Sequence, residues 1–97
     1  MILHLVLTYH WFDEMLAGRK DVEYRYLSNK WERDIWAKRE QITHARFQRA
    51  YDKNPATILR RVTKIDIGPC PYPGWSEDYY RIHLEPIHSR ATERGEG

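Results

Sequence analysis

A lysine, a glutamate and an arginine lie close together near the N-terminus and carry complementary charges. Lys20, Glu23 and Arg25 fall within one short segment. Alternate side chains of a strand point to the same side, so Glu23 and Arg25 would share a face, about 7 Å apart by the strand rise. Lys20 is an odd number of residues from Glu23, so strand alternation alone would point it to the other face. It would reach Glu23 and Arg25 from a turn, which its long side chain allows. These three are the candidate catalytic residues.

The three groups can perform acid–base or charge-stabilising chemistry. A lysine that loses solvent near Arg25 would give up its proton more readily and act as a base. Beside Glu23, the same ammonium would instead stay charged and stabilise a phosphate or an oxyanion. In a third reading, Glu23 and Arg25 form ordinary salt bridges and Lys20 is solvated.

No metal and no cofactor is predicted. The histidines show no paired ligand spacing, and no cluster of acids suggests a two-metal site. The single cysteine, Cys70, excludes an internal disulfide and a cysteine-based zinc site. There is no glycine-rich phosphate loop and no serine in a nucleophile elbow. Any hydrolysis would therefore be metal-independent.

The middle third of the chain is basic and contains interleaved aromatic residues. Residues 30–64 hold ten Lys/Arg and four Asp/Glu, a net charge of +6 against −4 for the rest of the chain. This suits a polyanion such as nucleic acid, although a solvated basic surface is the alternative. The candidate nucleic-acid contacts are Arg46, Arg49, Arg60 and Arg61 for phosphates, and Tyr51, Tyr72 and Trp75 for bases.

A loop rich in proline and glycine follows the basic region. Residues 68–78 contain three prolines and two glycines, which predicts an ordered loop that displays Tyr72 and Trp75. Trp75 is the aromatic residue most favoured for ligand contact, because the loop presents it. Its neighbours Glu77 and Asp78 are candidates for a second acid–base group.

The hydrophobic pattern predicts the elements that position these groups. Strands are expected at residues 2–8, 20–26, 42–51, 57–67 and 79–84. Short helices are expected at residues 9–17 and after Ser28, a candidate N-cap, with Gly18 at a left-handed helix end. The fourth strand changes parity near residues 61–63, which predicts a bulge. Together these elements predict an α+β fold, a small and mostly antiparallel β-barrel with two short helices.

Length and composition predict one domain over residues 1–85 and a disordered C-terminal tail over residues 86–97. Hydrophobic residues make up 41% and charged residues 31%, an ordinary soluble composition. No apolar run approaches the roughly 20 residues of a membrane span. The first residues lack the basic start and cleavage site of a signal peptide. A cytoplasmic protein without membrane contact is expected, and its oligomeric state stays open.

Residues 18–25, GRKDVEYR, resemble the signature of the ASCH family, G-x-K-x-x-E-x-R. The match falls on Gly18, Lys20, Glu23 and Arg25, after an opening strand and a helix as in the family. Arg46-Phe47 with Tyr51, and residues 79–82, look like the family's third and last strands, so the resemblance covers about residues 2–85. It implies a PUA-like β-barrel with a cleft, in a superfamily that handles RNA or modified nucleosides.

The resemblance leaves three functions open, each with RNA or a modified nucleoside as partner. The preferred one is a metal-independent ribonuclease acting on single-stranded RNA, in which Lys20 and Arg25 neutralise the phosphate while Glu23 or a tyrosine moves protons. The second is an amidohydrolase of N4-acetylcytidine. The family's amidohydrolases look to need a threonine three residues after the lysine, where this chain has Glu23. The third is a binding module without catalysis.

Overall fold

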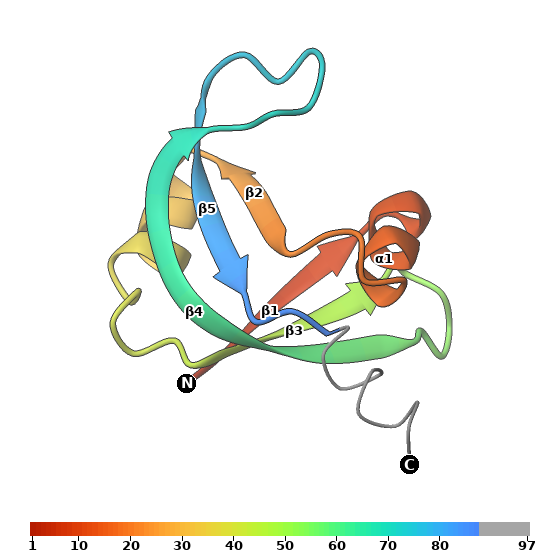
Figure 1. Ribbon diagram of the computed structural model, residues 1–97. Coiled ribbons are helices and arrows are strands. Elements are labelled where there is room, and N and C mark those ends of the chain that lie inside the picture. The colour runs from red at the N-terminus through yellow and green to blue at the C-terminus, as the bar shows by residue number, and fades with distance from the viewer. Residues whose placement is uncertain (88–97) are drawn as a thin grey trace.

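One curled sheet of five strands dominates the computed structural model, which describes residues 1–87 (Figure 1). The elements in chain order are β1 (Ile2–Leu7), α1 (Tyr9–Leu16), β2 (Val22–Tyr26), α2 (Asn29–Trp31), the π-helical turn η1 (Glu32–Trp36), β3 (His44–Arg49), β4 (Thr57–Pro69) and β5 (Asp78–Leu84). The predicted α+β class, the strand segments and the short helical segments are confirmed. Most of the predicted tail, residues 88–97, lies outside the described residues.

The sheet is mixed, with the strand order β1-β3-β4-β5-β2. β1 runs parallel to β3, and the other three neighbouring pairs are antiparallel. β4 bends strongly, because its first part pairs with β3 and its second part pairs with β5 (Figure 1). A register shift between Val62 and Lys64 marks the bend, at the place where the change of parity predicted a bulge.

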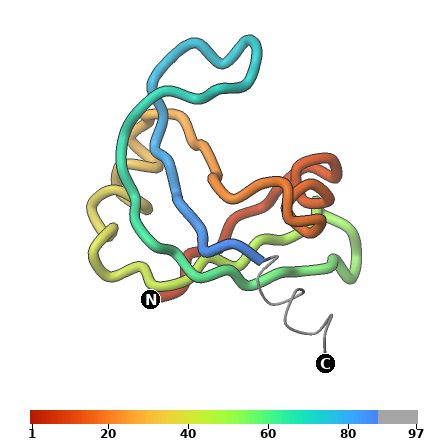
Figure 2. The backbone as a smooth tube through the Cα atoms, in the orientation of Figure 1, coloured from red at the N-terminus to blue at the C-terminus, as the bar shows by residue number. Residues whose placement is uncertain are grey.

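The curled sheet is a half-barrel, so the predicted β-barrel is confirmed only in part because the sheet does not close. Closure would require β1 and β2, the two ends of the strand order, to pair with each other, and within residues 1–87 they do not. Alternation and short loops predict strands, but they carry no information on whether the two edge strands meet. The chain leaves β1, passes through α1 and enters β2 at the opposite edge (Figure 2).

The core fills the concave side of the sheet. Its largest fully buried side chains come from α1, β3, η1 and β5: Phe12, Met15, Phe47, Ile35 and Ile82. Alternate residues of β1 and β5 are also buried: Leu3, Leu5, Leu7, Tyr80, Ile82 and Leu84. Leu16, at the end of α1, is 57% exposed although the pattern of the helix places it with Phe12 and Met15.

The ends of the helices set the direction in which the chain approaches the charged motif. Gly18 has φ +82°, the left-handed conformation predicted for it, and its N–H donates to Met15 O at 3.0 Å. Ser28 Oγ accepts from the N–H of Trp31 at 3.2 Å and so caps α2, as predicted. Thr8 stands at the N-cap of α1, but its side chain makes no capping bond. No described helix has both the length and the hydropathy for crossing a membrane.

Candidate functional site

Three charged side chains form a continuous chain from β2 to β1. Lys20 Nζ lies 3.2 Å from Glu23 Oε1. Arg25 approaches Glu23 Oε2 with Nη2 at 2.7 Å and with Nε at 2.8 Å. Arg25 Nη2 also donates to the backbone oxygen of Val6 on β1, at 3.0 Å. The structure therefore brings the three predicted residues together, and Arg25 connects the two edge strands that the sheet leaves unpaired. We call Lys20, Glu23 and Arg25 the Glu23 cluster.

Lys20 is enclosed by the protein and is only 4% exposed. Besides Glu23, its Nζ contacts Val22 O at 2.9 Å and the Tyr72 hydroxyl at 3.5 Å. These three partners match the three N–H donors of an ammonium group. Three aromatic rings surround the ammonium with centroids at 4.9 to 5.4 Å, those of Trp11, Tyr24 and Tyr72. Lys20 is thus a fixed cation behind Glu23, not a solvated side chain.

A pocket of about 250 Å³ lies between β1 and β2, and we call it the edge pocket. Glu23 and Arg25 form its polar wall, whereas Lys20 does not line it. β1 and its end contribute Val6, Leu7 and Thr8. Five aromatic residues complete the lining: Trp11, Tyr24, Tyr26, Trp31 and Trp75. A ligand in this pocket would therefore touch Glu23 and Arg25 directly, and would sense Lys20 only through Glu23.

The polar wall keeps unused hydrogen-bonding capacity. A carboxylate offers about four acceptor positions, and Glu23 uses one for Lys20 and two for Arg25. One position on Oε1 is therefore open. Arg25 uses its Nε and Nη2 groups, and its Nη1 has no partner within residues 1–87. The wall thus presents one acceptor beside guanidinium donors.

The loop after β4 brings Trp75 to the edge pocket. Tyr72 anchors this loop by stacking on Trp11, with centroids 4.7 Å apart and an interplanar angle of 20°. The rings of Trp75 and Tyr26 are nearly parallel, at 2°, with centroids 6.4 Å apart. Tyr26 is 62% exposed, so this pair of rings is reachable from solvent. The pair offers flat apolar faces to a planar ligand.

The half-buried tyrosines Tyr24 and Tyr72 beside the cluster are poorly suited to act as bases. Burial raises the pKa of the Tyr24 and Tyr72 hydroxyls above their usual value. Both therefore stay protonated at neutral pH. Glu23 also lines the edge pocket and is therefore the candidate base there.

Two of the arginines predicted to contact phosphates, Arg49 and Arg60, already make hydrogen bonds within the protein. Arg60 is 3% exposed and donates to Lys20 O, Asp21 Oδ1 and Glu85 O. It has no accessible donor for a phosphate, contrary to the prediction, because these partners hold it on the inward side of β4, opposite the buried Ala45. Arg49 makes two bonds to Asp13, at 2.9 and 3.0 Å, and lies over the ring of Tyr9.

The remaining predicted contacts are spread over the surface. Arg46 and Arg61 lie on the convex side of the sheet, on β3 and β4. Tyr51 is 84% exposed, next to the strand end that also carries Thr8. Glu77 and Asp78 are exposed and are not part of the edge pocket lining. None of these residues belongs to the Glu23 cluster.

Several residues of the edge pocket were not predicted from the sequence. Alternation separates Tyr24 and Tyr26 from the face of Glu23 and Arg25, yet all four line the pocket. The reason is that β2 is an edge strand, so both of its faces border the open side of the sheet. Trp31 packs under the Arg25 guanidinium at 5.2 Å. The Ser28 cap was a usable signal for Trp31, since it places the first turn of α2.

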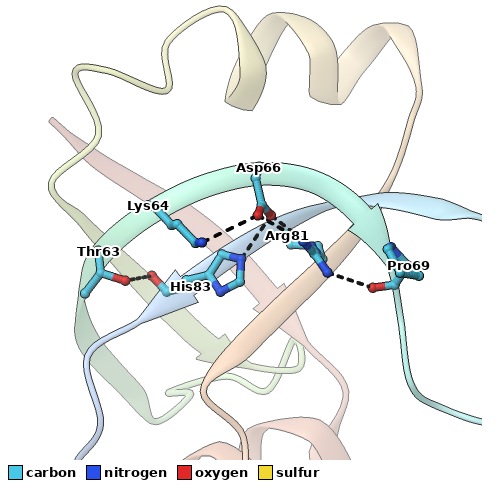
Figure 3. Close-up of polar contacts among 6 residues, drawn as sticks. All are labelled: Thr63, Lys64, Asp66, Pro69, Arg81 and His83. Atoms are coloured by element: carbon cyan, nitrogen blue, oxygen red, sulfur yellow. Dashed lines mark hydrogen bonds and ion pairs between the residues drawn. The ribbon is translucent and has the colours of Figure 1, made fainter.

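A second group of charges lies on the fully paired part of the sheet (Figure 3). Asp66 accepts two hydrogen bonds from Arg81 and one from His83, all at 2.9 Å, and Lys64 Nζ lies 3.8 Å away. The hydrogen bonds from Arg81 lower the pKa of Asp66 to about 2, and His83 adds to this effect. We call these four residues the Asp66 cluster. None of them lines the edge pocket.

No protein-family model, curated protein or solved structure matches this chain. In the part of the chain that the structure describes, no group of three or more His, Cys, Asp or Glu side chains gathers as metal ligands do. The chemistry available at the edge pocket is that of a carboxylate, a guanidinium and aromatic rings.

Proposed function

We propose that the edge pocket binds a single base of single-stranded RNA, or a modified nucleoside. The observation that carries this proposal is the set of five aromatic residues around the Glu23–Arg25 pair. Proteins that recognise unpaired bases stack them on aromatic rings and hydrogen-bond to their edges. The open acceptor on Glu23 and the free donors of Arg25 are suited to such an edge.

The mixed charge of the polar wall favours a neutral ligand. An aromatic cage with one carboxylate would suit a quaternary or methylated ammonium, but the guanidinium of Arg25 lines the same space. A phosphate in that space would meet the carboxylate of Glu23. A neutral ring with a donor next to an acceptor avoids both repulsions. The volume of about 250 Å³ is below the range of roughly 300 to 1,000 Å³ for drug-sized ligands, which favours one base or nucleoside.

We include in this proposal that the chain is an ASCH protein with a PUA-like fold. The four signature residues, Gly18, Lys20, Glu23 and Arg25, all serve the same site. Gly18 ends α1 and directs the chain to the cluster, and the other three form it. A half-barrel with its pocket at the open side supports this assignment.

Calorimetric titration with free nucleosides tests the binding proposal. Cytidine, N4-acetylcytidine, adenosine, guanosine and uridine cover the possible donor and acceptor edges. Arg25→Lys removes the planar guanidinium, and we expect it to weaken binding by about tenfold or more. Trp75→Ala should also weaken binding, by removing a stacking face. Arg81→Lys is the matched control, because it changes an arginine–carboxylate pair outside the pocket. Wild-type protein that binds no nucleoside, or equal losses in Arg25→Lys and Arg81→Lys, would refute the proposal.

Hydrolysis without a metal is the second candidate. It is favoured by the open acceptor position of Glu23 next to Arg25 in the pocket wall. Glu23 would take a proton from water as the water attacks, and Arg25 would stabilise the negative charge that develops. In an acylated cytidine the amide C–N bond would break, giving a carboxylic acid and the free amine. Lys20 would act as a positioning residue, since it does not line the pocket.

Incubation with single-stranded RNA and with N4-acetylcytidine, in the presence of a chelator, tests the second candidate. Chromatography of the products should show cleavage or free cytidine with wild-type protein. Glu23→Gln, checked for folding by circular dichroism, should abolish the reaction. Nucleoside binding without product would identify a binding module instead.

A further inference from the structure

A second surface adjoins the edge pocket on the convex side of β1, β3 and the first part of β4. Alternation turns Leu3, Leu5 and Phe47 into the core and leaves the residues between them facing outward. We call this surface the outer face. The strand register defines two adjacent cross-strand rows on this face. One row contains Ile2, His44 and Arg61, and the next contains His4, Arg46 and Leu59.

The outer face contains cations but no carboxylate in these rows or in the next row, which is Val6, Gln48 and Thr57. Arg46 and Arg61 are the two arginines within residues 1–87 whose side chains have neither a hydrogen bond nor an ion pair. Six other arginines pair with carboxylates, and Arg39 bonds to Trp36 O. The positive charge of the outer face is therefore not neutralised by its neighbours.

A hollow of about 90 Å³ lies on the outer face, next to the edge strand β1. His4, Arg46, Gln48 and Thr57 provide its polar groups. Val6 lines both the hollow and the edge pocket, so the two are separated by the width of β1. At roughly 30 Å³ for each water molecule, the hollow has room for a small group such as a phosphate and not for a base.

We propose that the outer face binds the phosphate backbone of the RNA strand whose base occupies the edge pocket; this inference rests on the proposed function. A strand with one base in the pocket passes over Val6 at the edge of β1. Its next phosphates then meet Arg46 in the hollow and Arg61 beyond it. These two side chains lie diagonally on neighbouring antiparallel strands, about 7 to 8 Å apart. This division of labour separates base recognition from backbone binding.

A flexible nucleic acid fits the outer face better than a lipid surface does. Anionic membranes are recognised by clusters of about four to eight Lys/Arg, more than these rows contain. The outer face also exposes Leu59 at 48% and Ile2 at 38% beside the arginines. Apolar surface next to cations suits a strand that carries both phosphates and bases.

The salt dependence of binding to a labelled short single-stranded RNA tests the inference. Fluorescence anisotropy between about 50 and 200 mM salt gives the slope of log affinity against log salt, which is about −0.7 for each phosphate contacted by a single-strand binder. Arg46→Gln and Arg61→Gln should each make the slope shallower by about 0.7, and the double variant by about twice that. Binding of a free nucleoside, which has no phosphate, should stay unchanged in all three.

Arg33→Gln is the matched control, because Arg33 is also exposed, at 69% of its side chain, but lies on η1 outside the outer face. It should keep the wild-type slope. An unchanged slope in the double variant would overturn the inference, as would Arg46-dependent binding to phosphatidylserine vesicles with no binding to RNA. RNA binding that depends on Arg46 and Arg61 without any nucleoside binding would refute the function proposed for the pocket and support the outer face as a phosphate surface.

Discussion

The Glu23 cluster and the Asp66 cluster have similar groups in different places. Each holds one carboxylate between cations, and in each two nitrogen atoms of an arginine lie within 2.9 Å of the carboxylate. The side chain of Glu23 is 7% exposed and that of Asp66 is 32% exposed. The main difference is their position in the sheet. Asp66 and Arg81 lie on β4 and β5, which have neighbours on both sides, whereas Glu23 lies on the edge strand β2.

Position in the sheet decides what each carboxylate can do. Asp66 joins two strands that are already paired, so its ion pairs brace an existing contact (Figure 3). Glu23 faces a side of the sheet that no strand fills, and its partner Arg25 reaches across to Val6. The open side leaves room for a ligand next to the charges. Thus an ion-pair cluster at an unpaired edge is a better candidate site than one on paired strands.

Removal of the Glu23 charge should have the largest effect on stability. Glu23→Gln leaves Lys20, which is 4% exposed, without its counter-charge. Removing one partner of a buried pair costs about 3 to 5 kcal/mol, so we expect a loss of that size in the free energy of unfolding. Urea denaturation measures it.

High salt should change the stability losses of the two clusters differently. Because buried pairs are screened little, the loss in Glu23→Gln should persist in high salt. The loss in Asp66→Asn should shrink under the same conditions. A Glu23→Gln variant as stable as the wild type would show that Lys20 finds another partner. That result would contradict a Lys20 side chain enclosed with Glu23 as its counter-charge.

Asp66→Asn should have a smaller effect that depends on pH. The pKa of Asp66 is lowered from 3.8 to about 2, so its ionised form stabilises the fold above about pH 4, and this stabilisation is lost as the pH falls through 2. After a discount for solvent screening, we expect a loss of about 1 to 2 kcal/mol at neutral pH, and a loss that shrinks toward zero as the pH falls below about 2. Denaturation at several pH values measures the difference. A constant difference over this range would contradict the assigned role.

Gly68→Ala should disturb the Asp66 cluster indirectly. A Cβ at this position would lie 2.6 Å from Arg81 Cζ, so the guanidinium has to move away. Because the Arg81 hydrogen bonds are the largest cause of the lowered Asp66 pKa, that pKa should rise. Titration of the carboxyl carbon by NMR measures it. The cost in stability should be smaller than that of Asp66→Asn, and an unchanged Asp66 pKa would show that Arg81 keeps its bonds in another rotamer.

Lys64→Gln should have the smallest effect. Its Nζ is 3.8 Å from Asp66 and its side chain is 65% exposed, a geometry in which an ion pair contributes little. We expect the unfolding midpoint and the Asp66 pKa to stay at their wild-type values. A clear loss of stability would mean that the number of cations near a carboxylate matters more than burial and hydrogen-bond geometry.

Most of the local structure was predictable because it depends on near neighbours in the chain. Alternation located the strands and put Glu23 and Arg25 on one face, and the change of parity located the bulge in β4. Gly18 and Ser28 were identified by the backbone geometry that helix ends require. The arrangement of the strands was less predictable, since the predicted barrel does not close and the parallel pairing of β1 with β3 was not foreseen.

The sequence by itself determined which residues carry charge at the site and how they are spaced along the chain. Only the tertiary structure decided that Lys20 is enclosed, that Arg60 is buried, and that aromatic residues from both faces of β2 meet at one pocket. The physical reason is range. A two-residue alternation and a helix cap act between near neighbours, whereas burial depends on strands that are far apart in the sequence. The open side between β1 and β2 is such a long-range property, and it makes the Glu23 cluster a candidate binding site.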